Sequence, residues 1–580
     1  MLLKQLSDHF AYSSKKENIN LWFQSPSCYI PTAVRFLIQL DRQGKYLGLV
    51  STTGSGKRDK GKEYLTPHML VTSGIEAKLL VGNVEYALGR PRDHKKKDPK
   101  VIDRHRAFVD KIKACALTTG NPLVKAILAF FESDEPERVA LPDDFNPADL
   151  FTFQVEGLLP VDSEEIRDHW AEVQRDELEL RSESHTCIVC GAECFPIKLH
   201  PVQLKGIPGG QTSGMALVSA NADAFESYGL KRNLIAPICL NCAQTYAKAA
   251  SSLLTSEDSS LRIGPLAYVF WTREESGFNV ARLFSKPEPQ DVRSLLASAW
   301  KGRHYTALDT EAFYAAALSA SGGRVVVRDW LETTVGEAKE HLARWFVLQD
   351  LVDWDGSQGS PYGLYPLTAS LVHDPRRDLP PNVPRIMLKV ALQGGPLPSW
   401  LLFQAIKRNR AEQAITRPRA ALIKMVLLSQ DKNIQEDAMV QMDEGNRHPA
   451  YLCGRLLAVL EQVQFLAVSP KATLIDRFYG TASTAPASVF PRLVRGAQPH
   501  LGKLRKERFG AYVSLQNRLE GVMQNLASFP KVLTLEEQGW FSLGYYHQRA
   551  WDRAQAKARK EEQVPGEDAV VEETPIDENE

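Results

Sequence analysis

The chain has 580 residues, of which 43% are hydrophobic and 24% charged, a composition ordinary for a globular protein of about two to four domains. Its formal net charge is zero, but the last twenty residues hold nine acids and no Lys or Arg, which leaves +9 for residues 1–560. We therefore expect a mildly basic body and an acidic, disordered tail over 561–580. A basic body is compatible with a nucleic-acid partner but does not require one.

The N-terminus and the cysteines exclude several protein classes. The opening segment MLLKQLSDHFAY is short and carries charge early, unlike a secretory signal peptide. The sequence contains no uninterrupted apolar run of about 18 residues, so it predicts no membrane span. Eight cysteines, four of them in CxxC pairs, favour a metal site in a reducing compartment over a disulfide framework. We expect a cytoplasmic protein with no membrane partner.

Helix and strand signals alternate through the first part of the chain. The patterns predict a helix and a short strand over 1–40, a strand over 47–50, helices ending at 88, 116 and 132, and a strand over 151–155. Asn83 and Tyr86 would share a face of the helix that ends at Leu88, and Asn83 is a candidate DNA contact.

A loop rich in Gly and Lys, STTGSGKRDKGK, follows the second predicted strand over 51–62. It lacks the GxxxxGK[ST] spacing of a P-loop, because Lys57 is followed by Arg58. Two interpretations stay open: a solvated, mobile loop, or a contact with a phosphate backbone. For the second, the candidate residues are Lys57, Lys60 and Lys62.

Four cysteines bracket the stretch 185–254, which a charged helix over 163–183 precedes. Cys187-x-x-Cys190 opens the stretch and Cys239-x-x-Cys242 nearly closes it. Two paired thiolates that meet two more can hold one tetrahedral Zn²⁺. We predict a structural zinc that clamps the two ends of a long loop. The alternative is a set of buried or free thiols, and Cys194 is a spare fifth thiol.

A glycine loop lies inside the clamped stretch, Gly209-Gly210-Gln211-Thr212-Ser213-Gly214. Glycines let backbone N–H groups approach a ligand closely, Gln can read base edges, and Ser or Thr can hold phosphate. A plain β-turn loop is the alternative. The downstream candidates for DNA contact are Asn221, Lys231 and Arg232.

Strands over 268–272 and 324–328 and a helix over 334–351 complete a predicted α+β region, residues 1–380. A proline cluster at 379–384 marks a boundary. Helical periodicity dominates 381–560, with apolar residues at helical spacing at Leu452, Leu456, Val459, Leu460 and Val463. The expected fold is a mixed N-terminal region followed by an all-α helical bundle.

A basic cluster occupies the bundle helix expected over 488–506. Its members are Arg492, Arg495, Lys503, Arg505, Lys506 and Arg508. It is either a solvated helix face or a stripe that lies along a nucleic-acid backbone. No HExxH or GxSxG motif occurs and the histidines are scattered, so the sequence gives an enzyme little support.

The run GGQTSGMALVSANADAFESYGLKRNLIAP, residues 209–237, resembles the signature of the CRISPR-associated large subunit of type I-C Cascade. Further stretches similar to that family occur in the same order along the chain, at 72–89, 319–330, 447–464, 482–507 and 533–550. The resemblance covers nearly the whole chain. The zinc prediction rests on the cysteine spacing and not on this resemblance.

The resemblance implies a non-catalytic subunit of an RNA-guided antiviral complex. Such a subunit recognises the protospacer-adjacent motif in double-stranded DNA, promotes duplex opening and holds the displaced strand, while the guide RNA supplies sequence specificity. The implied partners are target DNA, the guide RNA complex, the Cascade backbone subunits, a small subunit and a helicase-nuclease. A metal-dependent nuclease or hydrolase and a purely structural scaffold are the alternatives.

The helical C-terminal part resembles the small subunit, which type I-C systems can also make by internal translation initiation. The internal methionines Met425, Met439 and Met442 precede this part. A start at Met439 would give a product of 142 residues, enough for an independent helical bundle.

Overall fold

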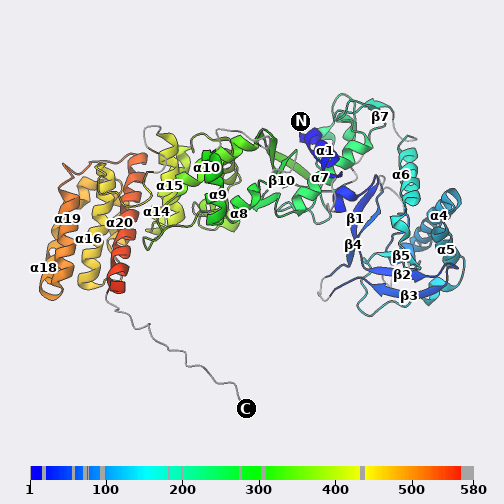
Figure 1. Cartoon of the computed structure of the whole chain (residues 1–580), viewed down its shortest axis with the longest axis horizontal. Coiled ribbons are helices and arrows are strands. Elements are labelled where there is room, and N and C mark those ends of the chain that lie inside the picture. The colour runs from blue at the N-terminus through cyan, green and yellow to red at the C-terminus, as the bar shows by residue number, and fades with distance from the viewer. Residues whose placement is uncertain are drawn as a thin grey trace, which may run out of the picture. The chain divides into compact units, whose positions relative to one another are not determined.

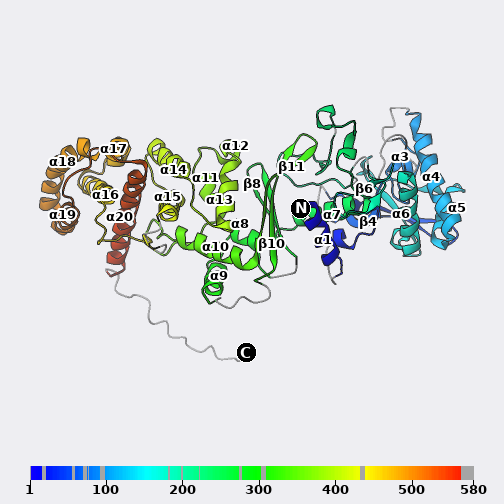
Figure 2. The same ribbon diagram turned by 90° about the horizontal axis from the view of Figure 1, so that it is seen from above.

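The protein is described from a computed structural model of the whole chain (Figures 1 and 2). The described residues are 2–562, except 16–20, 55–58, 70–74, 76, 92–97, 180–182, 198–199, 201, 221, 274–276, 302–308, 432–434 and 436–437. Helix and sheet are mixed, with a helical C-terminal region, which confirms the predicted fold class. The chain forms two compact units, one of residues 1–275 with 315–330 and one of residues 276–314 with 331–580.

In the residues that the structure describes, the first unit combines helices with four small sheets. Its helices are α1 (Leu2–Ser13), α2 (Leu21–Gln24), α3 (Val84–Ala87), α4 (Lys100–Thr119), α5 (Pro122–Phe131), α6 (Glu164–Glu179) and α7 (Leu240–Thr255), with short 3-10 turns η1 (Glu135–Arg138), η2 (Pro160–Asp162), η3 (Asp223–Phe225) and η4 (Arg232–Ile235). Its strands are β1 (Tyr29–Val34), β2 (Phe36–Leu40), β3 (Tyr46–Ser51), β4 (Lys62–Pro67), β5 (Phe151–Val155), β6 (His185–Thr186), β7 (Glu193–Cys194), β8 (Ser260–Ile263) and β9 (Leu266–Thr272), joined by most of β10 (Ala312–Ser321) and β11 (Arg324–Thr334).

The strands form sheets of two, two, three and four strands. β1 pairs with β4, and β6 with β7, both antiparallel. In the order β3-β2-β5, the pair β2–β3 is antiparallel and β2–β5 is parallel. The fourth sheet has the order β11-β10-β9-β8. An aromatic cluster of Phe108, Phe130, Phe131 and Phe153 joins α4 and α5 to β5, so these helices cover the β3-β2-β5 sheet.

The second unit is mainly helical. Its elements are α8 (Val280–Ser285), α9 (Pro289–Lys301), α10 (Val335–Gln349), α11 (Leu364–Ala369), α12 (Pro375–Asp378), α13 (Asn382–Gln393), α14 (Ser399–Glu412), α15 (Arg417–Gln430), α16 (Pro449–Val468), α17 (Leu474–Ala482), α18 (Pro486–Glu507), α19 (Phe509–Met523) and α20 (Leu535–Glu562). α16 lies between α20 on one side and α18 and α19 on the other (Figures 1 and 2).

The core of this bundle follows the predicted apolar spacing. All five residues predicted along α16, from Leu452 to Val463, are at most 1% exposed, which confirms them as core. Within the described residues, α16 is the one helix long and apolar enough to cross a membrane by length and composition. Of its qualifying window, 72% is buried in the unit, as expected for the central helix of a bundle.

The compact units divide the chain at other places than the predicted boundary at residue 380. The proline cluster at 379–384 lies inside the second unit, because α10 and α11 pack against α13 and α15, so residues on both sides share one core. The predicted tail over 561–580 begins inside α20, which extends to Glu562, and its remainder lies outside the described residues.

One predicted helix needs correction. The pattern placed Asn83 and Tyr86 on a helix that ends at Leu88, but the described helix there is only α3, Val84–Ala87. Asn83 precedes it as the N-cap, and its side-chain oxygen accepts a hydrogen bond from the Glu85 backbone N–H at 3.0 Å. A capping side chain satisfies the open end of a helix, so Asn83 starts α3 and does not lie on its face.

Candidate metal centre and nucleic-acid surfaces

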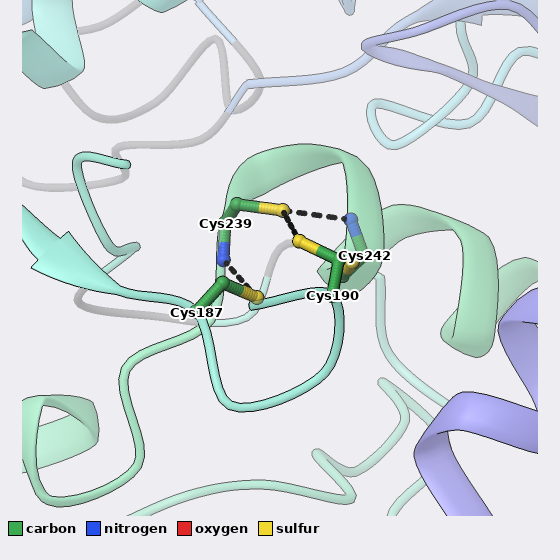
Figure 3. Close-up of side chains that lie close together, drawn as sticks. All are labelled: Cys187, Cys190, Cys239 and Cys242. Carbon is green, nitrogen blue, oxygen red and sulfur yellow. Dashed lines mark hydrogen bonds between the residues drawn. The ribbon is translucent and has the colours of Figure 1, made fainter. Parts of the chain in front are cut away.

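The four predicted cysteines lie together (Figure 3). Their Sγ atoms are all within 4.8 Å of one another, and those of Cys190 and Cys239 are 3.9 Å apart. Four thiolates about 2.3 Å from a tetrahedral zinc would be about 3.8 Å from one another, so the spacing fits such an ion. All four are free thiols, and together they could hold one metal ion.

Two local structures bring these thiols together across the sequence gap. Cys187 and Cys190 lie in the turn between β6 and β7, where the Cys187 carbonyl accepts a hydrogen bond from the Gly191 N–H at 2.8 Å. Cys239 is the N-cap of α7, and Cys242 is in its first turn. The Ile188 N–H donates to the Pro237 carbonyl at 3.0 Å, which ties the turn to the start of the helix.

Backbone N–H groups point at the sulfur atoms. The Cys239 N–H donates to the Cys187 Sγ and the Cys242 N–H donates to the Cys239 Sγ, each at 3.4 Å. Burial disfavours the Cys187 thiolate, but hydrogen bonds from the backbone N–H groups of Cys190, Cys239 and Val189 outweigh it and lower the pKa of Cys187 to about 7. Burial and the neighbouring thiols raise the pKa of Cys242, so a cation is needed before all four can ionise together.

Cys194 lies outside this group of four. It is in β7, where burial and the charges of Cys187 and Cys239 raise its pKa to about 11. The group of four thiols that lie within reach of one ion does not include Cys194, so it is its position that leaves it as a spare thiol.

The glycine loop is the tip of a hairpin in the first unit. Leu204 and Met215 exchange backbone hydrogen bonds at its base, and the Gly214 N–H donates to the Gln211 carbonyl at 3.0 Å. Gly214 has φ +100°, and a Cβ there would lie 2.7 Å from the Gln203 Cβ, so the turn requires glycine. The side chains of Gln211, Thr212 and Ser213 are exposed.

The turn between β10 and β11 supports this loop from a distant part of the sequence. Ala216 donates its N–H to the Gly323 carbonyl at 3.3 Å and accepts from the Val325 N–H at 2.9 Å. The Gln211 amide lies 3.8 Å from where a Cβ on Gly323 would stand. The Arg324 guanidinium lies 3.8 Å above the Phe225 ring, so the same turn contacts the segment that leads to Lys231 and Arg232.

The other predicted DNA contacts come from several segments of the first unit. Lys231 and Arg232 are exposed, and the Arg232 N–H donates to the Glu226 carboxylate at 3.0 Å. Lys60 is exposed before β4, and Lys62 begins β4 with its ammonium 5.6 Å from the Tyr64 ring. The remaining two, Lys57 and Asn221, lie outside the described residues.

The basic cluster lies on α18 of the second unit. All six of its members, Arg492, Arg495, Lys503, Arg505, Lys506 and Arg508, are exposed. Leu493, Ala497 and Leu501 are buried on the face of α18 opposite Arg492, Arg495, Lys503 and Lys506, and Arg508 is its C-cap. Sequence reasoning missed two aromatic features: the Phe225–Arg324 contact, which only long-range folding creates, and Phe509, which directly follows the cluster and is 64% exposed.

Comparison with curated proteins gave no match. A protein-family model described as CRISPR-associated protein (Cas_Csd1) matches residues 9–552, which covers both compact units. This match agrees with the coarse part of the resemblance in the sequence, that of a CRISPR-associated protein of Cascade type. The chain belongs to the Cas_Csd1 family of CRISPR-associated proteins.

Proposed function

We propose that this protein is the large subunit of a type I-C Cascade complex and recognises the protospacer-adjacent motif in double-stranded DNA. It then promotes duplex opening and holds the displaced strand, while guide RNA pairing supplies specificity. Its partners in this proposal are the guide RNA complex, the backbone and small subunits, and a helicase-nuclease. The family membership supports a role in a CRISPR-associated complex.

The observation that carries the motif-reading part is the supported glycine loop. Gln211, Thr212 and Ser213 are exposed on a turn whose base is held by the Leu204–Met215 pair and by the β10–β11 turn. A short, fixed loop with amide and hydroxyl groups can enter a groove of DNA with little loss of conformational entropy. Exposed Lys231 and Arg232, which follow the Phe225 segment that Arg324 contacts, would supply phosphate contacts.

The four cysteines serve a structural role in this proposal. A zinc ion bound by Cys187, Cys190, Cys239 and Cys242 would join both ends of the stretch that carries the glycine loop. Four protein ligands leave no open coordination position, so the ion would supply folding energy and not catalysis.

The test compares binding to duplexes that differ only in the short flanking motif. We expect the assembled complex to prefer the motif duplex, and Gln211→Ala to reduce this discrimination by about 1–3 kcal/mol if Gln211 reads a base. Gln203→Ala, an exposed Gln at the base of the same hairpin, is the matched control and should leave discrimination unchanged. Assembly without any motif preference would support a structural scaffold instead.

The proposal assigns no catalytic activity to this chain. A cleavage assay with divalent metal ions should find none in the purified protein. Robust cleavage that survives repurification and is lost with a point mutation in this chain would support the nuclease or hydrolase alternative.

A further inference from the structure

An exposed aromatic group lies at the corner between α18 and α19. α18 ends at Glu507, Arg508 caps it, and α19 begins at Phe509. The Phe509 side chain is 64% exposed, and its ring centroid is 6.1 Å from that of Tyr512. Val513, one turn further, is 38% exposed. We call Phe509, Tyr512 and Val513 the aromatic corner.

Phe509 is not part of the core face of α19. The buried residues of this helix are Leu515, Leu519 and Val522. At about 100° per residue, Phe509 lies about 120° around the helix from Leu515, so its ring does not follow the apolar stripe. Phe509 is one of several exposed apolar side chains, and it is distinguished from the others by the basic cluster that directly precedes it in the chain.

Positive charge precedes this corner along the chain. Residues 486–515 contain six Lys or Arg side chains and one acid, Glu507, whose carboxylate is 3.9 Å from the Lys503 ammonium. At about 100° per residue, Arg492, Arg495, Lys503 and Lys506 fall within an arc of about 80° on α18. This stripe of charge runs along the helix and ends beside Arg508 and Phe509.

We propose that the α18–α19 corner binds single-stranded nucleic acid, with phosphates along the basic stripe and a base stacked on Phe509. The stripe alone would attract single strands and duplexes alike, because phosphate contacts carry no information about base exposure. Base faces are hidden in a duplex and open in a single strand, so an aromatic ring adds affinity only for the latter. This inference rests on the proposed role of the chain in holding the displaced strand, and it assigns that role to the basic stripe and to Phe509.

The test measures binding of the full-length protein to a fluorescein-labelled oligothymidine and to an abasic oligodeoxyribose phosphate of equal length. Phe509→Ala should weaken oligothymidine binding by about 5- to 100-fold and leave abasic binding unchanged. Phe509→Trp should restore binding, since it keeps a stacking surface. The matched control is Phe403→Ala on α14, which removes a side chain that is 54% exposed and should change neither affinity.

Two results would overturn the inference: unchanged oligothymidine binding by Phe509→Ala, or an equal loss with the abasic probe. The triple substitution Lys503→Ala, Arg505→Ala, Lys506→Ala separates it from the proposed function. If the triple variant binds both probes as the parent does, the stripe itself is not a nucleic-acid surface. A different result would refute only the stacking. In that case the triple variant loses affinity for both probes, while Phe509→Ala keeps its affinity for both, so the phosphate contacts are supported and the stacking on Phe509 is not.

Discussion

The chemistry of the candidate metal centre depends on single cysteines. The Cys187 Sγ accepts a hydrogen bond from the Cys239 N–H, and the pKa of Cys187 is lowered to about 7. A large fraction of the Cys187 side chain is therefore in the thiolate form near neutral pH. Cys242, whose pKa is raised chiefly by burial, ionises only when a cation compensates its neighbours' charge. The ionisation of each of the four thiols therefore depends on the other three, whereas Cys194 lies outside this group.

Elemental analysis of purified protein should find one zinc per chain. Cys239→Ser should abolish metal binding and destabilise the first unit, because a tetrahedral site that loses one thiolate loses much of its affinity. Cys194→Ser is the matched control and should keep one zinc per chain. Essentially no zinc in the parent protein, or loss of zinc in both variants, would refute the assignment.

A buried histidine should make the second unit sensitive to acid. His547 is 1% exposed, its Nδ1 is 3.0 Å from the Tyr451 hydroxyl, and burial lowers its pKa to about 3. An unfolded His titrates near about 6.5, so between these values the unfolded chain binds the extra proton. Stability contributed by neutral His547 is therefore complete above about pH 6.5 and is lost as the pH falls.

Urea unfolding at pH 6.5 and at pH 5 measures this effect. His547 should account for a loss of about 2 kcal/mol over that interval, and His547→Gln should remove this share of the pH dependence. His373→Gln, at an exposed position, should keep the parent's dependence. An identical decrease in the parent and in His547→Gln would contradict the assignment.

At the scale of elements, α16 and α20 approach each other closely at two glycines. A Cβ on Gly454 would overlap the Phe541 carbonyl oxygen, and one on Gly544 would overlap the Tyr451 carbonyl oxygen. Backbone atoms cannot move aside cheaply in a packed pair of helices. The close approach also places Arg455 within 3.0 Å of the Gln548 side-chain oxygen, and the Tyr545 hydroxyl donates to Glu461.

Alanine at either glycine should therefore destabilise the bundle. We expect Gly544→Ala to lower the free energy of unfolding by about 1–3 kcal/mol through overpacking. Gly480→Ala on α17, where no atom lies within 4 Å of the added Cβ, should raise it by about 0.5–1 kcal/mol. Urea unfolding measures the sign of the change in the free energy of unfolding for each variant. A higher free energy of unfolding in Gly544→Ala would contradict the close approach of α16 and α20.

At the scale of the whole molecule, the second unit contains the segment that a separate small subunit would comprise. A product starting at Met439 would hold α16 to α20, which pack against one another. In the full chain, α14 and α15 also contact α20, and a Cβ on Gly539 would lie 3.1 Å from Leu402 and 3.3 Å from Ile423. A separate product would lack α14 and α15, so this face of α20 would be exposed and would need another partner.

Mass spectrometry of the native complex tests for this product. We expect extra copies of a fragment of about 142 residues, if translation starts at Met439, beside one full-length chain. A Met439→Leu substitution should remove that fragment and spare the full-length chain. If every copy of the helical region is joined to residues 1–380, no separate small subunit is made from this gene.

Local patterns alone determined several features correctly. The strand over 151–155, the apolar face of α16 and the basic cluster of α18 follow from the period of neighbouring side chains, which survives whatever packs against them. The doubled CxxC pattern identified four cysteines that lie together and could hold a metal ion, because a metal site requires residue types and spacings that are visible in the sequence.

Only the tertiary structure decided the remainder. β10, Ala312–Ser321, is rich in alanine, a weak strand former, and becomes a strand because β9 and β11 flank it. The division into units follows from α10 and α11 packing across the proline cluster, which no local signal records. Gly323 supports the glycine loop from more than a hundred residues away, because contacts between distant segments depend on how the whole chain folds.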